Sequence, residues 1–256
     1  MAESISSTRN EYIKSLKLLR KKSEREERRL FIAEGILCAG EALNYAEVDA
    51  FLYTEKYADS KERKLAEEKG VRCILTSEEA MSAVCTSKNP QGAVAIVKKT
   101  EMKYEKKGLF LLLENLSDPQ NVGTMIRTAD AMGASAVILT KESADAFASA
   151  CVRATMGSIF HIPVIYTEDI YAVAEDLKAN GVGIIAGHLK GNGSFPKYKN
   201  TAIFIGNETR GLSEKASSLA DSLYKIPMYG RAESLNAAIA AAILMQKASE
   251  AMHEEY

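Results

Sequence analysis

The sequence predicts an α/β protein with two domains, the second of which contains a parallel sheet. Three observations predict this fold class. The chain has 256 residues, more than the commonest domain size of about 100–150 residues. Short apolar runs alternate with helical stretches, as in α/β proteins. The alternation is interrupted at residues 98–107 (KKTEMKYEKK), where no apolar periodicity remains, so we interpret this stretch as the linker between the domains.

Residues 1–29 are predicted to form a basic helical arm. They contain nine Lys or Arg residues against five Glu residues, a net charge of +4. Their apolar residues form a weak helical stripe, made of Ile13, Leu16, Leu18 and Leu19. Two interpretations of the charges remain open at this point, a solvated helix face and a surface that follows phosphates.

Residues 30–97 are predicted to form a small α/β domain, because four apolar runs are separated by helical stretches. The expected strands are FIAEG (31–35), FLYT (51–54), VRCIL (71–75) and GAVAIV (92–97). The expected helices are 36–46, a charged helix near 59–69, and a short one between residues 75 and 92.

Residues 108–256 are predicted to form a larger α/β domain. Its strands are continuous apolar runs, which is typical of a parallel sheet covered on both faces. The expected strands are LFLLL (109–113), AVIL (136–139), GIIAG (183–187), AIFIG (202–206) and LYKIPM (223–228). The expected helices are 119–132, 145–156, 169–180, 213–220 and 233–250, the last of them buried on nearly all sides because residues 234–246 carry no charge.

The composition argues against several classes of protein. With 33 basic and 34 acidic residues the net charge is −1, so a nucleic-acid partner must be held by a local surface. No stretch reaches the ~20 apolar residues of a membrane span and the N-terminus lacks an apolar signal region, so we expect a cytoplasmic protein. No metal site and only buried thiols are expected, since metal-ligand spacing is absent among Cys38, Cys73, Cys85, Cys151, His161, His188 and His253.

Ligands of parallel α/β sheets bind beyond the carboxyl ends of the strands, and three segments at such ends are unusual. The first is DPQNVGTMIRTAD (118–130), in which Asp118 and Pro119 suit the start of a helix. The apolar stripe of this helix leaves four residues facing away from the core, Asn121, Thr124, Arg127 and Asp130. A surface pair between Arg127 and Asp130 is the alternative to a functional role for Arg127.

The second and third segments also place polar groups where strands end. IFIGNETRGL (203–212) follows a buried strand with Asn207, Glu208 and Arg210, and its alternative interpretation is a polar loop with turn glycines. IPMYGRAESLNAAIAAAILM (226–245) carries Ser234 and Asn236 before an Ala-rich helix, where they either cap the helix or hold a polar ligand.

Familiar nucleotide and hydrolase motifs do not explain these segments. The string GVGIIA (181–186) fits G-x-G-x-x-A, but it follows a helix and enters a strand, the reverse of the dinucleotide-binding context. The sequence contains no Walker A motif, no G-x-S-x-G and no H-E-x-x-H.

Taken together, the three segments resemble the motifs of the SpoU-type (TrmH-like) RNA 2′-O-ribose methyltransferases of the SPOUT class. The first motif, Asn-x-Gly-x-x-x-Arg, is matched by Asn121, Gly123 and Arg127. The second, Gly-x-Glu-x-x-Gly-Leu, is matched by Gly206, Glu208, Gly211 and Leu212. The third, Ser-Leu-Asn, is matched by Ser234, Leu235 and Asn236. One departure is Asn207, where many members carry Ser.

The resemblance implies an α/β-knot catalytic domain, with a deep C-terminal trefoil knot, over residues 108–256. The N-terminal half is similar to the family's substrate-binding domain through FIAEGILCAGEAL (31–43) and NPQGAVAIV (89–97). A small ribosomal-protein-like α/β domain that binds RNA is therefore expected over residues 30–97. The family site is built across two subunits, so the resemblance also implies a homodimer.

The resemblance further implies S-adenosylmethionine as cofactor and assigns roles to named residues. The cofactor-binding residues would be Gly206, Asn207, Ile226, Met228 and Leu235, and the catalytic residues Asn121, Arg127, Glu208, Ser234 and Asn236. Arg127 is the family's proposed base, but a guanidinium with a pKa above ~12 stays protonated. We therefore expect it to clamp a phosphate and stabilise the developing oxyanion, while the proton goes to an RNA phosphate or to water.

Three functions are compared from these observations. The first is an RNA 2′-O-ribose methyltransferase acting on ribosomal RNA, 23S rRNA above all, with tRNA as the alternative substrate. The second is a non-catalytic RNA-binding protein of ribosome assembly with the same fold, which the presence of Arg127 and of residues 234–236 disfavours. The third, a nicotinamide-dependent oxidoreductase, is disfavoured by the context of residues 181–186.

Overall fold

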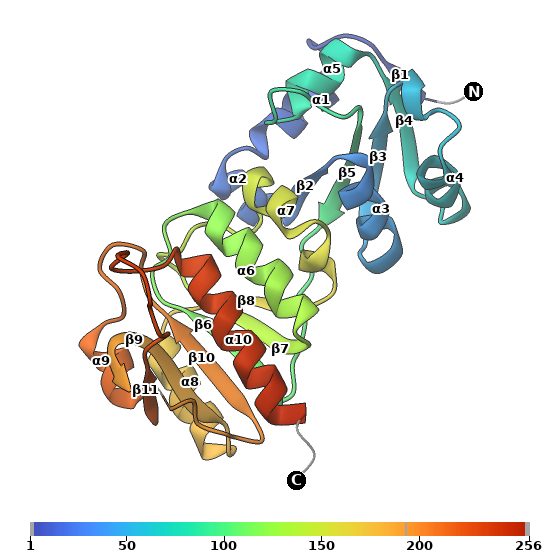
Figure 1. Cartoon of the computed structure of the whole chain (residues 1–256). Helices are drawn as coiled ribbons and strands as arrows, with labels where there is room; N and C mark the ends of the chain where they lie inside the picture. Colours follow the sequence, from blue (N-terminus) through green and yellow to red (C-terminus); the bar gives the residue numbers. More distant parts are fainter. Residues whose placement is uncertain (1–2, 193, 254–256) are drawn as a thin grey trace. The chain divides into compact units, whose positions relative to one another are not determined.

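The computed structural model describes residues 3–192 and 194–253, and these residues form two compact units (Figure 1). Unit 1 contains residues 3–101 and 145–161, and unit 2 contains the rest of the described chain. The chain first passes from unit 1 to unit 2 between residues 101 and 102, within the stretch 98–107 that the sequence predicted as a linker, and residues 145–161 return to unit 1. The first two residues of the predicted arm and the last three of the predicted C-terminal domain lie outside the described residues.

Unit 1 contains a five-stranded mixed sheet. Its strand order is β1 (Glu3–Ile5), β4 (Arg72–Thr76), β3 (Val48–Tyr53), β5 (Ala93–Lys98), β2 (Leu30–Glu34). Strand β5 is antiparallel to both of its neighbours, and the other pairs are parallel. The helices of this unit are α1 (Glu11–Leu18), α2 (Lys22–Arg28), α3 (Ile36–Tyr45), α4 (Lys61–Glu68), α5 (Glu78–Val84) and α7 (Ser149–Thr155), with 3₁₀ turns at Glu55–Tyr57 and Ser158–Phe160.

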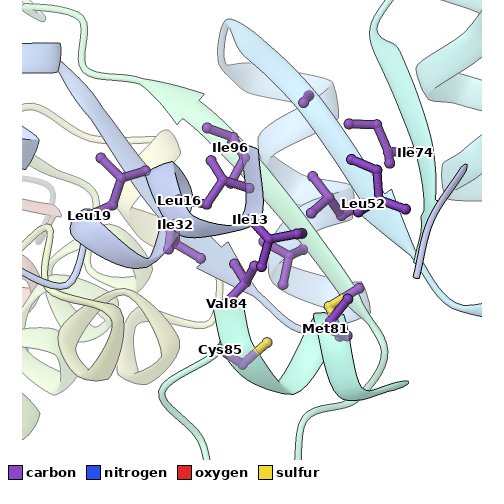
Figure 2. Close-up of a cluster of buried hydrophobic side chains, with 14 residues drawn as sticks. Ile13, Leu16, Leu19, Ile32, Leu52, Ile74, Met81, Val84, Cys85 and Ile96 are labelled. Carbon is purple, nitrogen blue, oxygen red and sulfur yellow. The ribbon is translucent and has the colours of Figure 1, made fainter. Parts of the chain in front are cut away.

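The predicted basic arm is part of unit 1 rather than a separate element. Strand β1, which the sequence did not predict, pairs with β4, and α1 begins where the Asn10 side chain accepts a hydrogen bond from the backbone N–H of Tyr12 (2.8 Å). Ile13, Leu16 and Leu19 are at most 1% exposed in the core of the unit (Figure 2). Three of the four residues of the predicted apolar stripe therefore close a hydrophobic core, while the charged face of α1 stays in solvent. The fourth, Leu18, is 42% exposed, so its predicted place in the stripe is wrong.

Residues 145–161 pack in unit 1, although the sequence placed them in the second domain. The Arg25 guanidinium contacts Asp145 at 2.5 Å, and both side chains are less than 10% exposed. The Arg153 guanidinium contacts the buried carboxylate of Glu34 at 2.7 Å. Buried charges persist only when they are paired, so these two ion pairs attach the segment to unit 1. The partners lie 119 and 120 residues apart, and no local pattern could indicate them.

Unit 2 contains a six-stranded sheet in which every pair is parallel, so the predicted parallel sheet is confirmed. The strand order is β11 (Ser222–Tyr224), β9 (Gly183–Asn192), β10 (Thr201–Ile205), β6 (Leu109–Leu113), β7 (Ala134–Thr140), β8 (Val164–Thr167). Strand β8 was not predicted. Strand β11 ends at Tyr224 instead of continuing to residue 228, and Pro227 has no N–H to extend the ladder.

Helices cover both faces of this sheet. Helices α6 (Pro119–Ala131) and α10 (Ala237–His253) pack against each other on one face, and α8 (Ile170–Ala179) and α9 (Glu214–Leu219) cover the other (Figure 1). Helix α10 begins at Ala237 rather than at residue 233, and it is not buried on all sides. Ala241, Leu244 and Met245 lie in the core, but Ile239 is 51% exposed.

Two further features bear on the composition arguments. In the part of the chain that the structure describes, no helix is long and apolar enough to cross a bilayer. The thiols of Cys38, Cys85 and Cys151 are free and buried, as predicted. Cys73 is also a free thiol but is only half-buried, so the prediction of buried thiols is wrong for this residue.

Candidate active site

The site lies where the strand order of unit 2 changes direction. From β6 the chain first builds β7 and β8 on one side and then β9, β10 and β11 on the other. The segments that follow β6 and β10 therefore diverge from adjacent strand ends, the place where ligands bind in open α/β sheets. The two segments start in contact, because the Glu114 N–H donates to the Ile205 carbonyl (2.9 Å).

The segment after β10, residues 206–212, forms a closed loop. We call it the cofactor loop because it contains two of the predicted cofactor-binding residues, Gly206 and Asn207. The Asn207 side-chain oxygen accepts hydrogen bonds from the N–H groups of Thr209 (3.0 Å) and Arg210 (3.1 Å). The Gly211 N–H donates to the Asn207 carbonyl (2.9 Å). A Cβ on Gly206 would lie 2.3 Å from the Gly211 carbonyl carbon and from the Leu212 nitrogen. Gly206 is therefore required because the far end of the loop packs on it.

Glu208 attaches this loop to the segment after β6. One carboxylate oxygen accepts hydrogen bonds from the Ser117 hydroxyl (2.8 Å) and N–H (3.1 Å). The other accepts from the Asp118 N–H (3.2 Å) and from the Asn121 side-chain amide (3.1 Å). Four donors thus converge on one carboxylate, and all of them favour its charged form.

Asn121 extends this network to the third motif. Its side-chain oxygen accepts a hydrogen bond from the Asn236 amide (3.0 Å). The Asn236 oxygen in turn accepts from the N–H of Ala238 (2.8 Å), which caps α10. Asn121 is 9% exposed, so the prediction that it faces away from the core is wrong. It faces Glu208 and Asn236 because their donors and acceptors satisfy its amide.

The electrostatics of the network keep Glu208 ionised. Partial burial raises the pKa of its carboxyl group, but the hydrogen bonds from Asn121 and Ser117 outweigh this and lower the pKa to about 2. Glu208 is therefore a hydrogen-bond acceptor that holds the loop, and it is a poor general base at neutral pH.

Substitution of Glu208 by Gln is expected to destabilise the protein in a pH-dependent way. The folded pKa of about 2 lies below the ordinary value of 4.5, so the charge stabilises the fold above pH 4.5, and this contribution is lost as the pH falls toward 2. The difference in unfolding free energy between wild type and Glu208→Gln should be constant above about pH 5 and shrink below it. Urea denaturation at a series of pH values measures this difference in unfolding free energy. A difference that stays the same as the pH falls toward 2 would contradict the claim that an ionised Glu208 stabilises the fold.

A pocket of about 450 Å³ lies beside the cofactor loop, next to the carboxyl ends of β10 and β11. Its lining combines residues 206–212 of this loop with residues of the chain between β11 and α10 and of α10 itself. The apolar part includes Leu212, Ile226, Met228, Leu235 and Leu244. An apolar cavity with a few directed polar groups is typical of a small-molecule site.

The structure brings most of the predicted site residues together at this pocket. The five predicted cofactor-binding residues line it, namely Gly206, Asn207, Ile226, Met228 and Leu235. Of the predicted catalytic residues, Glu208 and Ser234 line it too, while Asn121 and Asn236 adjoin it through the hydrogen-bond network. Arg127 does not line it and lies on the exposed side of α6. Asn236 caps α10 through its side-chain oxygen, and Ser234 is exposed two residues before it.

Sequence reasoning missed the polar residues that follow β6. The backbone carbonyl of Asn115 accepts a hydrogen bond from the Asn207 side-chain amide (2.7 Å). The Ser117 hydroxyl donates a hydrogen bond to the Glu208 carboxylate. The signal was present, because Glu114 and Asn115 interrupt the apolar run LFLLL at a strand end, as Asn207 and Glu208 do after β10. Among the residues that the structure places, no group of three or more His, Cys, Asp or Glu side chains is arranged to hold a metal ion.

Comparison with family models matches both units of the chain. Residues 108–246 match the SpoU rRNA Methylase family, and residues 10–95 match the MRM3-like substrate binding domain. A similar curated protein is the 23S rRNA (guanosine(2553)-2′-O)-methyltransferase RlmP of Bacillus subtilis (strain 168). It is 36% identical over 244 residues, which cover 94% of this chain and 97% of RlmP.

Similar solved structures cover the chain almost completely. An AdoMet-bound rRNA methyltransferase from Sinorhizobium meliloti aligns with a TM-score of 0.85 at 30% identity, covering 99% of each chain. The SpoU methyltransferase AviRb from Streptomyces viridochromogenes, in complex with AdoMet, aligns with a TM-score of 0.84 at 26% identity, covering 97% of this chain and 100% of AviRb.

Proposed function

The chain belongs to the SpoU rRNA methylase family and is a methyltransferase, and we propose that it methylates a ribose 2′-hydroxyl of 23S ribosomal RNA with S-adenosylmethionine as methyl donor. The observation that carries this proposal is the hydrogen-bond network that joins Asn121, Glu208 and Asn236 beside one pocket. These residues come from three separate motifs, and their hydrogen bonds bring all three motifs together at one pocket.

The pocket fits S-adenosylmethionine in size and chemistry. A volume of about 450 Å³ is in the range of small-molecule sites, and the apolar side chains of Ile226, Met228 and Leu235 suit the adenine ring. Gly206 and Asn207 would present backbone groups of the cofactor loop to its polar parts. When bound, the cofactor supplies an activated methyl group on a sulfonium.

The residues of the network would position the loop and the RNA. Glu208, ionised and fully occupied by donors, keeps the cofactor loop on the segment after β6. Asn121 and Asn236 link that segment to the start of α10, and Ser234 would contact the ribose. Arg127, exposed on α6, would clamp an RNA phosphate and stabilise the negative charge that develops on the 2′-oxygen.

The proposal also includes a trefoil knot in unit 2, a homodimer and a cytoplasmic location. The chain between β11 and α10 would pass through the segment that contains the cofactor loop and form a trefoil knot. Leu189, Tyr229 and Ile239 are 62%, 97% and 51% exposed in unit 2, and a second copy would cover such apolar side chains. In this homodimer Arg127 would serve the pocket of the partner. We expect the enzyme in the cytoplasm, since its proposed substrate is there.

Unit 1 would bind the RNA through a basic surface around the end of α5. The Arg20 guanidinium donates to the carbonyls of Ala83 (2.8 Å) and Cys85 (2.6 Å), which brings the end of the basic arm to this loop. Three exposed lysines lie within three residues of these anchor points in the sequence, Lys17, Lys21 and Lys88. A local basic surface of this kind would bind RNA although the whole chain has a net charge of −1.

Replacing these three lysines (Lys17, Lys21, Lys88) by Ala is expected to weaken RNA binding and to reduce its salt dependence. Loss of three phosphate contacts lowers the slope of log affinity against log salt by about 2–3. Filter binding of the RNA substrate at several salt concentrations measures both. The control replaces three exposed lysines elsewhere in unit 1, Lys56, Lys61 and Lys64, and should change neither. An equal loss of RNA affinity in both variants would contradict the proposal that this surface binds RNA.

The proposed function is tested by transfer of labelled methyl groups to total RNA from a strain that lacks the gene. We expect label in 23S rRNA and not in 16S rRNA or tRNA. Label in tRNA alone would reject rRNA in favour of the alternative substrate. No label in any RNA or ribosomal particle, from protein that binds S-adenosylmethionine, would support the non-catalytic function instead.

A further inference from the structure

Glu114 is a buried carboxyl group that no motif includes. It follows the last residue of β6 and is 2% exposed. One oxygen accepts hydrogen bonds from the Tyr171 hydroxyl and from the Ser213 hydroxyl (2.6 Å), and the other accepts from the Ser213 N–H (2.8 Å). The side chain thus accepts three hydrogen bonds, all from uncharged donors.

The partner Ser213 marks the far end of the cofactor loop. It directly follows Leu212, the last residue of that loop, and it caps α9 by accepting a hydrogen bond from the Ala216 N–H (3.1 Å). Glu114 therefore fixes the point at which the loop enters α9. Tyr171, in the first turn of α8, shares the same carboxylate and so ties α8 to this point.

The near end of the loop is held by the very next residue of the chain. The Asn115 carbonyl accepts the hydrogen bond from the Asn207 amide (2.7 Å), and Asn115 has a left-handed backbone (φ +57°). The Asn115 N–H is fixed in turn by the Thr140 hydroxyl (3.0 Å). Two consecutive residues thus hold both ends of the loop that lines the pocket.

We infer that Glu114 is a positioning residue, which holds the cofactor loop in its binding shape before S-adenosylmethionine arrives. This inference rests on the proposed function, since it takes the pocket to be the S-adenosylmethionine site. Binding is tighter when a loop is already ordered, because no ordering entropy is lost on association. The loop closes on itself at Gly206 and Gly211, so a shift of Ser213 is passed to the residues that line the pocket.

The test replaces Glu114 by Gln, which keeps the size of the side chain but removes one acceptor. We expect the Kd for S-adenosylmethionine, measured by calorimetry, to rise about 10-fold or more. In the absence of the cofactor, amide hydrogen exchange of residues 206–213 should speed up by a similar factor. Tyr171→Phe removes one donor and is a milder variant, expected to change both quantities in the same direction by a smaller factor.

The matched control is Glu34→Gln in unit 1, another buried carboxylate that accepts hydrogen bonds from backbone N–H groups. It should lower the Tm without changing the Kd or the exchange of the loop. If Glu114→Gln behaves like this control, Glu114 is only structural and the inference is wrong. If the wild-type protein itself does not bind S-adenosylmethionine, the proposed function fails, whatever the exchange data show.

Discussion

Substitution of Arg127 by Ala is expected to lower methyl transfer about 10²–10³-fold while leaving the affinity for S-adenosylmethionine unchanged. Arg127 is exposed on α6 and does not line the pocket of its own chain, so its loss removes no contact from that pocket. This expectation follows from the proposed role of Arg127, in which its guanidinium stabilises the developing charge on the 2′-oxygen more in the transition state than in the ground state. Single-turnover transfer of labelled methyl groups measures the first quantity and calorimetry the second.

Arg127→Lys separates the contribution of the positive charge from that of the guanidinium geometry. Lysine keeps the positive charge but lacks the planar fork of donors, so activity should lie between those of wild type and Arg127→Ala. Full activity of the alanine variant would contradict the assignment. An equal loss of cofactor affinity and activity would show that Arg127 stabilises the pocket instead of acting on the RNA.

Substitution of Gly206 by Ala is expected to abolish detectable binding of S-adenosylmethionine, a loss of affinity of about 100-fold or more. The added Cβ would lie 2.3 Å from backbone atoms of Gly211 and Leu212, and backbone cannot rotate away as a side chain can. The loop must therefore open, and with it one wall of the pocket. Equilibrium dialysis with labelled cofactor measures the effect.

Gly211→Ala is the matched control in the same loop. Its Cβ would meet nothing within 4 Å, although the left-handed backbone (φ +71°) strains any residue with a side chain. That strain is about 1 kcal/mol, which corresponds to a loss of affinity of no more than about 10-fold. If Gly206→Ala and Gly211→Ala bind S-adenosylmethionine equally well, the packing of the loop on Gly206 does not determine the shape of the pocket.

Much of unit 2 could be predicted from the sequence because its signals are local. Asp118 and Pro119 indicated the start of α6, and the structure has the helix beginning at Pro119 with the Asp118 side chain accepting from the Gln120 N–H (2.8 Å). The buried parallel strands were predicted because each is a continuous apolar run. Strand β8 was missed because its residues 164–167 are half-buried at an edge of the sheet and show no clear period.

The parts that could not be predicted depend on contacts between distant residues. The orientation of Asn121 is decided by Glu208 and Asn236, which lie 87 and 115 residues further along the chain. A helical stripe only assigns polar residues to the solvent side, so Asn121 was placed there. The uncharged residues of α10 predicted burial on nearly all sides, whereas in the single chain Ile239 stays 51% exposed.

The most direct test of the central claim is the chemical position of the transferred methyl group. RNA labelled by the wild-type enzyme is digested to nucleosides, which are separated and identified by mass spectrometry. We expect a single 2′-O-methylated nucleoside, in an RNA that resists alkaline cleavage at that one position. A methyl group on a base, with the phosphodiester still cleaved by alkali, would contradict the account.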